Sequence, residues 1–513
     1  MKCIVDREQM AQIDEYTMKA VGIPSMVLME RAAFSVFEQI KTRLKKDSKV
    51  LIVVEGGNNG ADGLALARML FLEKIRADVY YIHALKKESN EFMLQSRILK
   101  NMGIEIKEEM DEKKSYDMIV DGIFGNGLSK PVRGIHESVL GKLNEMSGDK
   151  IAIDMPTGVD ASTGKILGTC FRADLTITFG YYKIGQLLYP GRLHCGEVVV
   201  TQIGFAPQAV SFLEKKVYMY ETSDLQYLPK RKADGNKGSF GKVAVIAGSK
   251  EIGGAAYFSA HSAYVTGAGL VKVFTHENNR IMLQSNIPEA LLETYAEDTI
   301  KNNSKELENK ISSIYDWADA VVLGPGLGKN EISYEIVNVC MNHITKPTVI
   351  DADAINILSE FPMWIPSGKP MIFTPHLMEL SRISKLTLEQ IKEDLVLVAG
   401  QMAKKYSCVF ICKDASTVVA DYDHQTYINI SGNHGMATGG SGDVLAGIIG
   451  GLLAQGMDVK RASGLGVYLH GLAGDEAGKN VGFYGLIARD LIQYIPKVMR
   501  QYFKNGCEQA VDV

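Results

Sequence analysis

One pattern constrains the fold of this chain more than any other: a short apolar run ends in glycine or polar residues, and a helical stretch follows. Residues 49–54 form such a run, residues 55–63 the turn, and residues 64–72 the helical stretch. Runs of this kind are typical of the buried strands of a parallel sheet. Their alternation with helices predicts a doubly wound α/β sheet that binds ligands at the carboxyl ends of its strands. Strands are predicted in the first half at residues 49–54, 78–83, 118–121, 151–154 and 175–179.

Strand-to-turn signals recur in the second half, and a helical tail follows them. The signals lie at residues 242–248, 270–274, 320–328, 347–354, 371–376 and 408–417, and the tail at residues 467–503. Residues 432–451 are rich in glycine and end in an apolar run that is long enough for about two helical turns. Such a loop brings backbone N–H groups close to an anion. Asp443, the first charged residue after the loop, either caps the helix or accepts a proton from a hydroxyl beside a phosphate.

A chain of 513 residues is too long for one ordinary core and predicts two domains. We place the boundary near residue 218, which divides the chain into residues 1–218 and 219–513. Two helices are predicted within residues 6–45, the second opening at Pro24. The polar run of residues 230–241 is interpreted as a solvated linker rather than as a phosphate or RNA patch.

Charge and composition exclude several classes of partner. The net charge is −4, so no global basic field attracts nucleic acid or a membrane. No run of about twenty apolar residues is present, and no membrane span is expected. The seven scattered cysteines and the charged N-terminus favour a reduced, cytoplasmic chain without a signal peptide. We expect small-molecule substrates and a homo-oligomer.

Polar side chains gather at three strand ends of the first half. They are Asn58, Asn59, Asp62, Asp121, Asp154 and Thr157. These ends meet at one edge of a parallel sheet, where their oxygens suit a hard cation. Each Asn-Gly or Asp-Gly sequence alone is also a turn former. Three of them on successive strand ends favour a ligand site.

These motifs resemble the NAD(P)H-hydrate epimerase domain over about residues 1–215. The matching segments are N-N-G-x-D-G at 58–63, D-x-x-F-G-x-G-L at 121–128 and D-x-P-T-G-V-D at 154–160. The resemblance implies a potassium ion held by Asn59, Asp121 and Thr157. The hydrate-binding residues that it implies are Asn58, Asn59, Gly60, Ala61, Asp62, Gly125, Asn126, Gly127, Leu128, Ser129, Lys130, Pro131 and Asp154.

Two of these positions carry a specific expectation. Asp154, which the resemblance places against the nicotinamide ring, is the best general acid or base, because epimerisation at a carbinol carbon requires proton transfer. The family usually has glycine at the position of Ala61, so the Ala61 methyl group is expected near the ligand.

Polar groups also follow the strands of the second half. They are Asp351, Asp353, His376, Glu379 and Lys413. Alone, such a histidine is more often structural, such a lysine is more often solvated, and the aspartates are able to cap a helix. Together with residues 432–451 they form an ordered set around one predicted crevice.

That set resembles the ribokinase-like fold and, within it, the ADP-dependent NAD(P)H-hydrate dehydratases, over about residues 220–505. The matching segments are K-G-S-F-G-K-V at 237–243, G-P-G-L-G at 324–328, T-P-H at 374–376 and M-A-T-G-G-S-G-D-V-L at 436–445. The family often has glycine where this chain has Asp414, which is expected to add a carboxylate beside the phosphates. The implied nucleotide-binding residues are Lys413, Asp414, Ala415, Ser416, Thr417, Gly439, Gly440, Ser441 and Gly442, and the implied hydrate-binding residues are Ala255, Gly326, His376 and Asp443.

The chain is therefore predicted to be a bifunctional repair enzyme for hydrated NADH and NADPH (NADHX and NADPHX). A Rossmann-like first domain is predicted to interconvert the two hydrate epimers, and a ribokinase-like α/β sandwich to dehydrate one of them. Asp443 is predicted to be the catalytic base of the second reaction, with ADP as the donor of phosphate to the alkoxide, assisted by Mg²⁺. One alternative is a small-molecule kinase fused to a Rossmann-like ligand-binding domain. Another makes the first domain a non-catalytic binding module.

Overall fold

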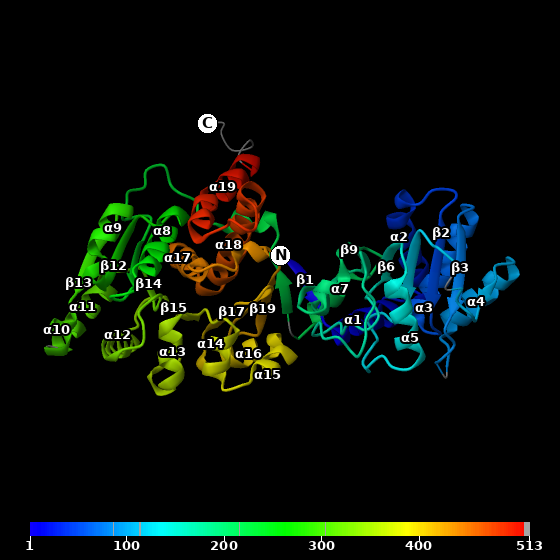
Figure 1. The fold of residues 1–513 in the computed structure, drawn as a ribbon, viewed down its shortest axis with the longest axis horizontal. Helices are drawn as coiled ribbons and strands as arrows, with labels where there is room; N and C mark the ends of the chain where they lie inside the picture. The colour runs from blue at the N-terminus through cyan, green and yellow to red at the C-terminus, as the bar shows by residue number, and fades with distance from the viewer. Residues whose placement is uncertain (86, 112–113, 215, 303, 507–513) are drawn as a thin grey trace. The chain divides into compact units, whose positions relative to one another are not determined.

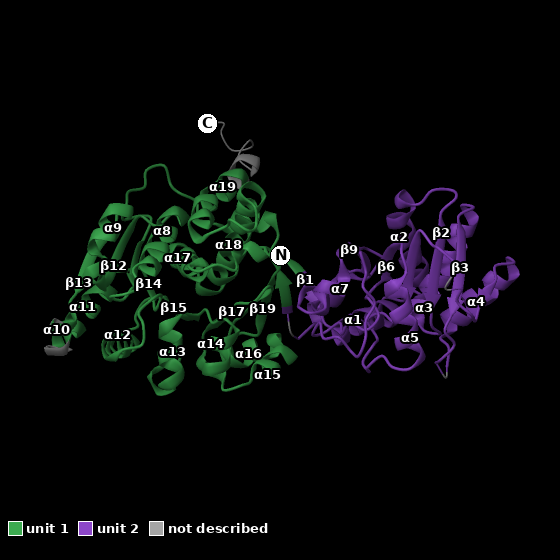
Figure 2. Cartoon of the chain, viewed as in Figure 1, with its two compact units in different colours: residues 1–2, 217–513 green, residues 3–216 purple. Residues whose placement is uncertain are grey.

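The computed structural model describes residues 1–85, 87–111, 114–214, 216–302 and 304–506. The chain divides into two compact units (Figures 1 and 2). Residues 3–216 form the N-terminal unit, and residues 217–513 with residues 1–2 form the C-terminal unit. The sequence did not predict that residues 1–2 belong to the C-terminal unit. They do so because the Met1 ammonium contacts Asp224 Oδ1 at 2.7 Å.

The N-terminal unit is built on a parallel sheet in the strand order β4-β3-β2-β5-β6-β7-β9. Its strands are β2 (Lys49–Val54), β3 (Arg76–Tyr81), β4 (Ile106–Lys107), β5 (Met118–Gly122), β6 (Asp149–Ile153), β7 (Leu175–Phe179) and β9 (Glu197–Thr201). The principal helices are α1 (Arg7–Glu15), α2 (Ser25–Ile40), α3 (Asn58–Leu72), α4 (Asn90–Asn101) and α5 (Ile135–Glu145). The predicted parallel α/β sheet is confirmed, while β4 and β9 were not predicted.

Successive side chains of β2 pack into two different cores, one on each face of this sheet. Val50, Ile52 and Val54 pack with apolar residues of α2, α3 and α4. Leu51 and Val53 pack with residues of α5. This alternation is what a strand with helices on both faces requires.

Helix α3 begins at Asn58, six residues earlier than the predicted helical run. Its glycines make this possible, because they let the first turns lie directly on the sheet. A Cβ atom at Gly60 would lie 1.8 Å from the carbonyl oxygen of Glu55, and one at Gly63 would lie 2.7 Å from Cγ1 of Val54. The segment predicted as a turn is therefore largely helix, and its polar residues stand at a helix N-terminus.

The C-terminal unit has the strand order β13-β12-β11-β14-β15-β16-β17-β18-β19-β10, with β10 at Lys216–Met219. Pairing is parallel from β13 to β17 and antiparallel from β17 to β19. The strands are β11 (Lys242–Ile246), β12 (Leu270–His276), β13 (Leu291–Tyr295), β14 (Ala320–Leu323), β15 (Thr348–Ile350), β16 (Met371–Phe373), β17 (Val409–Cys412), β18 (Thr417–Ala420) and β19 (Gln425–Asn429). The helices used below are α8 (Gly254–Thr266), α13 (Asp353–Glu360), α14 (Leu377–Ser384), α17 (Ser441–Ala454), α18 (Val459–Val481) and α19 (Ala488–Gly506).

Helix α17 is the buried centre of the C-terminal unit. It has 14 residues, twice the length predicted from its apolar run, and all residues from Val444 to Ala454 are buried. Its glycines allow the close packing that keeps it buried: a Cβ atom at Gly447 would lie 2.2 Å from the carbonyl oxygen of Ser259 in α8. The helical tail predicted as one element is two helices, α18 and α19, separated at Gly482, which has a φ of +79°.

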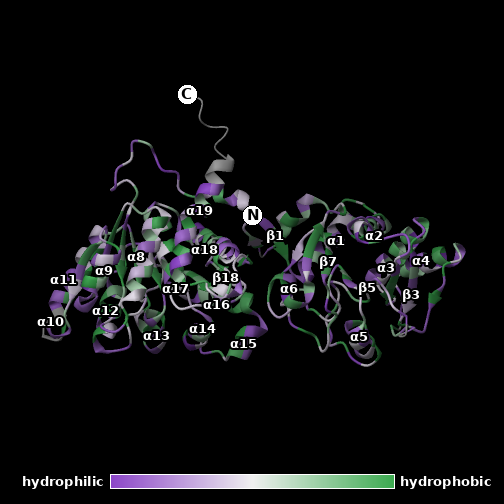
Figure 3. Ribbon diagram, turned by 45° about the horizontal axis from the view of Figure 1, so that its top comes forward, coloured by the Kyte–Doolittle hydropathy of each residue, from purple (hydrophilic) through white to green (hydrophobic). Residues whose placement is uncertain are grey.

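The polar run of residues 230–241 forms an exposed loop before β11, inside the C-terminal unit. Figure 3 shows this loop largely in the purple of hydrophilic residues. The six cysteines that the structure describes are free thiols, and Cys507 lies outside the described residues. In the described part of the chain, no helix has the length and apolar character needed to cross a membrane.

Two candidate active sites

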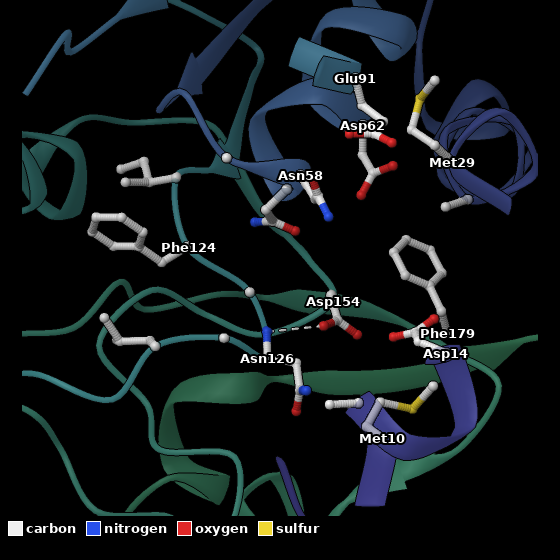
Figure 4. Close-up of a pocket in the computed structure, with 18 of the residues that line it drawn as sticks. Met10, Asp14, Met29, Asn58, Asp62, Glu91, Phe124, Asn126, Asp154 and Phe179 are labelled. Atoms are coloured by element: carbon white, nitrogen blue, oxygen red, sulfur yellow. Dashed lines mark hydrogen bonds between the residues drawn. The ribbon is translucent and has the colours of Figure 1, made fainter. Parts of the chain in front are cut away.

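A cavity of about 880 Å³ lies at the carboxyl edge of the N-terminal sheet (Figure 4). Helices α1 and α2, the start of α3, the loop after β5 and the residue after β6 all contribute to its wall. The sequence-predicted residues that line it are Asn58, Asn59, Asp62, Gly125, Asn126, Gly127, Leu128, Ser129, Lys130, Pro131 and Asp154. Its size suits a nucleotide-sized ligand.

Gly60 and Ala61 are not among the described residues that line this cavity. Both lie in the first turns of α3, where Gly60 meets the backbone of Glu55. Ala61 is fully buried among the apolar side chains between α3 and the sheet. The Ala61 methyl group therefore lies in the core rather than on the cavity wall, because the helix turns that residue toward the sheet.

Asp154 occupies the centre of a polar network at the end of β6. Its Oδ1 atom accepts hydrogen bonds from Lys183 Nζ at 2.6 Å and from Thr178 Oγ1 at 3.1 Å. Its Oδ2 atom accepts one from the Asn126 backbone N–H at 3.0 Å. The backbone of Asp154 has a φ of +63°, which is unusual for aspartate and aims the side chain into the cavity.

Three carboxyl groups near Asp154 give the cavity an acidic wall. Burial raises the pKa of Asp62 well above its ordinary value, and the neighbouring Asp154 and Asp14 carboxyl groups raise it further. Burial also raises the pKa of Asp14 to about 6, opposed by Lys183. Glu91, the third, accepts a hydrogen bond from Ser25 Oγ at 2.6 Å.

The sequence analysis missed Asp14 and Lys183. Lys183 is the only cationic partner of Asp154 among the described residues, and its side chain is 1% exposed. A signal for it was present, because it stands four residues after a predicted strand in a G-Y-Y-K turn. Asp14 lies in the last turn of α1, one turn after Met10, and nothing in its local sequence distinguishes it from a solvated helix residue.

The predicted potassium ligands lie in one buried group. Asp121 is fully buried and accepts hydrogen bonds from the Thr157 backbone N–H at 2.7 Å and from Thr157 Oγ1 at 2.8 Å. Asn59 reaches the same loop, since a Cβ atom at Gly125 would lie 2.9 Å from Asn59 Oδ1. The Asn59 amide nitrogen is buried without a hydrogen-bond partner in the described structure.

This group fits a large monovalent cation. The described residues provide no lysine, arginine or histidine as an ion-pair partner of Asp121, and burial raises the pKa of Asp121 to about 6. Hydroxyl, amide and carboxylate oxygens with a single negative charge suit K⁺ better than Mg²⁺, which requires stricter octahedral geometry.

In the C-terminal unit, three strand ends and α17 bring charged groups together. Lys413, after β17, donates a hydrogen bond of 2.8 Å to Oδ1 of Asp351, after β15. Thr374, after β16, donates one of 2.6 Å to the same oxygen. A Cβ atom at Gly442 would lie 3.2 Å from Lys413 Nζ, so the first turn of α17 lies against this pair.

Asp443 is not the cap of α17. The N-cap is Gly440, which has a φ of +90°, and Asp443 lies inside the first turn. Burial and the carboxylate of Asp351 raise the pKa of Asp443 to about 7, against the opposing effect of Lys413. A carboxyl group that titrates near neutrality is suited to accept a proton from a hydroxyl.

The glycine loop before α17 is held by α18, which the sequence analysis did not connect to the site. His470 Nε2 lies 3.4 Å from Ser441 Oγ, and burial lowers the pKa of His470 to about 4. Asp475 accepts a hydrogen bond from the Gly432 backbone N–H at 2.9 Å. The sequence H-x-x-x-x-D at 470–475 was a usable signal, because His470 interrupts a run of mostly small and apolar residues at 462–474 and Asp475 ends it.

The residues predicted for the second hydrate pocket fall into two places. Ala255 and Gly326 are in contact, because a Cβ atom at Gly326 would lie 2.9 Å from the Ala255 Cβ. His376 instead caps α14, where its Nδ1 accepts hydrogen bonds from the backbone of Met378 and Glu379. A parallel bridge to Lys413 places His376 beside the charged pair.

Residues 413–417 form the connection from β17 to β18, beside the start of α17. Asp414, the departure from the family pattern, is exposed, and its backbone carbonyl accepts a hydrogen bond from Thr417 Oγ1 at 3.2 Å. Its position allows the carboxylate to turn to solvent. An extra negative charge beside the phosphates is therefore not imposed by the fold.

The fold and the two sites define the class of this protein: an α/β enzyme with two active sites, each at the carboxyl edge of its own largely parallel sheet. Two family models match the chain. Residues 25–185 match the one described as YjeF-related protein N-terminus, and residues 243–497 match the one described as NAD(P)H-hydrate dehydratase.

Relatives match nearly the whole chain. The bifunctional NAD(P)H-hydrate repair enzyme of Thermofilum pendens is 34% identical over 500 residues, 95% of this chain and 94% of its own. The enzyme of the same name from Moorella thermoacetica is 32% identical over 97% of this chain and 96% of its own. The solved structure of an ADP/ATP-dependent NAD(P)H-hydrate dehydratase from Bacillus subtilis, co-crystallised with ATP and Mg²⁺, is 26% identical, covers 56% of this chain and 99% of its own, and has a TM-score of 0.49.

This chain belongs to the family of bifunctional NAD(P)H-hydrate repair enzymes. Both resemblances that the motifs predicted are thereby confirmed.

Proposed function

We propose that this enzyme repairs hydrated NADH and NADPH in two steps, one in each unit. The N-terminal site epimerises the hydroxyl-bearing carbon of the damaged ring. The C-terminal site dehydrates the S epimer to NADH or NADPH at the expense of ADP, which yields AMP and phosphate. The observation that carries this proposal is that each unit holds its own proton-transfer group at a strand-end site, within a chain of this family.

In the N-terminal site, we assign proton transfer to Asp154 and binding of the hydrate to the cavity wall described above. The loop after β5 lines the cavity, and its remaining backbone N–H groups are proposed to bind phosphate oxygens. Asn59, Asp121 and Thr157 are the residues proposed to hold K⁺, whose charge offsets the buried Asp121 carboxylate beside an anionic ligand.

In the C-terminal site, Asp443 takes the proton of the hydrate hydroxyl. The resulting alkoxide attacks a nucleotide phosphorus, and the phosphorylated hydroxyl then leaves as phosphate, which hydroxide by itself does poorly. Backbone N–H groups of residues 439–442, at the start of α17, are proposed to stabilise the charge that develops on the transferred group. Residues 413–417 are proposed to hold the nucleotide, and Ala255, Gly326 and His376 the hydrate.

Mg²⁺ fits this site as a companion of the nucleotide. The described residues contain no group of three or more His, Cys, Asp or Glu side chains arranged to hold a metal. Asp351 and Asp353 are near enough to Asp443 to influence its pKa. One or two carboxylates together with substrate phosphates are the usual ligands of Mg²⁺, which supplies charge neutralisation during phosphoryl transfer.

The cytoplasmic location and the homo-oligomer stay predictions.

The test is to incubate the full chain with mixed hydrate epimers and to follow the absorbance of the reduced ring. With ADP, complete recovery of both epimers is expected. The Asp154→Asn variant should recover the S epimer at the normal rate and the R epimer only at the spontaneous rate. Accumulation of a phosphorylated product without recovery of the reduced ring would support the kinase alternative instead.

A further inference from the structure

Asp62 has a buried carboxyl group with which no other described residue pairs. It lies one turn into α3, its residue is 8% exposed, and it lines the N-terminal cavity. Among the described residues it has neither a hydrogen-bond partner nor an ion-pair partner. Figure 4 shows its carboxyl group directed into the cavity rather than into the packed face of α3. An unpaired carboxyl group in such a place requires a partner from the ligand.

The surroundings of Asp62 raise its pKa and favour the protonated form. Burial is the largest influence on its pKa, and the nearby Asp154, Asp14 and Glu91 carboxyl groups all act in the same direction. The described residues offer no cation as partner, because Lys183 is engaged by Asp154, Thr178 and the Phe179 carbonyl. A neutral carboxyl group donates a hydrogen bond, whereas an ionised one only accepts.

Asp154 has the opposite environment. The Lys183 ammonium and the Asn126 backbone N–H both donate to its oxygens. The cavity therefore presents one carboxyl group paired with a cation and another without one, both facing the same space (Figure 4). Two carboxyl groups whose environments separate their protonation states are the usual arrangement of an acid and a base in one site.

We propose that Asp62 is the general acid of the epimerase site and acts opposite Asp154. This inference rests on the proposed epimerase function. The Asp62 proton passes to the hydroxyl oxygen on C6 of the hydrated ring, the C6–O bond breaks, and water leaves. The lone pair of the ring nitrogen forms the C=N bond of an iminium ion. Water then adds to C6 from the other face and gives its proton to Asp154, and both carboxyl groups return to their first states by proton exchange with solvent.

The arrangement accounts for an acidic wall around an anionic ligand. The iminium ion is a cation, and the Asp154 and newly ionised Asp62 carboxylates stabilise it electrostatically. The ring carbon beside C6 keeps its protons during this exchange, so the product is the other epimer and no reduced ring is formed. No oxidant, reductant or second substrate is required.

The test uses the full chain with the variant Asp62→Asn, which keeps the shape of the side chain but has no proton to donate as an acid. Asp174→Asn, at an exposed aspartate of the same unit, is the matched control. Epimerisation is followed by chromatography of the R epimer without ADP, from neutral to alkaline pH. We expect Asp62→Asn to slow kcat about 10²–10⁴-fold and to remove the fall in rate that the wild type shows at alkaline pH. Asp62→Glu, which restores an acid, should recover part of the rate.

Dehydration of purified S epimer with ADP reports whether each variant is folded, because it uses the other unit. An Asp62→Asn variant that keeps its kcat and only raises KM would overturn the assignment, since Asp62 would then merely bind the ligand. A kcat loss without any change in the alkaline limb would overturn it as well. A wild-type chain that does not accelerate epimerisation at all would overturn the epimerase function itself, and this assignment with it.

Discussion

Lys183 donates a hydrogen bond of 2.6 Å to Oδ1 of Asp154. Its ammonium group is the ion-pair partner of this carboxyl group. The lysine is 1% exposed and also donates to Thr178 Oγ1 and to the Phe179 carbonyl oxygen. Three acceptors around one buried ammonium satisfy all of its N–H bonds. The pair therefore sets both the charge and the position of the proposed proton-transfer group.

Replacing Lys183 by methionine should impair both stability and epimerisation. The change leaves Asp154 without its charge partner, and loss of one member of a buried ion pair costs roughly 3–5 kcal/mol. Thermal unfolding and the epimerisation rate measure the two effects. Lys100→Met, at an exposed lysine of α4, is the control. If the double variant Lys183→Met, Asp154→Asn is no more stable than Lys183→Met alone, the ion pair is not the cause.

Replacing Asp443 by asparagine should abolish dehydration and leave epimerisation intact. The amide keeps the shape of the side chain but does not accept the hydroxyl proton, while nucleotide binding should stay within roughly tenfold. Recovery of the reduced ring with ADP and purified S epimer is the measurement. Asp316→Asn, at an exposed aspartate of the same unit outside the site, is the matched control. Near-normal dehydration by Asp443→Asn would remove Asp443 from the mechanism.

The dehydration rate should depend on pH in the direction set by Asp443. Burial and the Asp351 carboxylate raise the pKa of Asp443 to about 7, and only the ionised form accepts a proton. The rate constant kcat/KM should therefore rise with pH through about 7 and level off above it. His470 should not contribute to this profile, because burial lowers its pKa to about 4 and it stays neutral throughout. A rate that falls over the same range would contradict the assignment of Asp443 as base.

Potassium should stabilise the chain at alkaline pH but not at acid pH. Burial raises the pKa of Asp121 to about 6, above its value in the unfolded chain, so its contribution to stability is lost as pH rises through about 6. K⁺ binds the ionised form and compensates for this loss of stability. At acid pH the carboxyl group is protonated, so there is no such loss for K⁺ to compensate. Thermal unfolding in potassium and in tetramethylammonium chloride, at about pH 5 and about pH 8, measures the difference.

Two further results would separate this site from a divalent one. Asp121→Asn should remove the difference between the two salts. A chelator of divalent ions should leave epimerisation unchanged while slowing the second unit. If the chelator stops epimerisation and potassium has no effect, the ion at Asn59, Asp121 and Thr157 has been wrongly assigned.

Replacing His470 by alanine should weaken nucleotide binding about tenfold, which corresponds to about 1.4 kcal/mol. The histidine supports Ser441 at the start of α17 and does not face the reacting atoms in this proposal. The effect should therefore appear in KM for ADP more than in kcat. The conservative change His470→Gln, which keeps a hydrogen-bonding group, should recover most of the affinity. An equal loss in kcat would make the residue part of the chemistry.

The sequence by itself determined the central strands of both sheets, the glycine turns that follow them, and the site residues nearest to these turns. These features depend on nearest neighbours: an apolar run of the right length is buried as a strand, and Gly, Asn and Asp mark the turn after it. The motifs around Asn58, Asp121, Asp154 and Asp443 could be recognised in the sequence for the same reason, since each lies within a few residues of a strand or helix end.

Only the tertiary structure decided which distant groups meet. Ala61 faces the core because α3 starts at Asn58, which depends on how closely Gly60 packs on the sheet. Asp154 is paired with Lys183, 29 residues away, and Ser441 is supported by His470, also 29 residues away. The protonation of Asp62 depends on its burial and on Asp154, Asp14 and Glu91, which belong to three other elements of the fold. Burial and electrostatic coupling are properties of neighbours in space, and a local pattern of residues does not contain them.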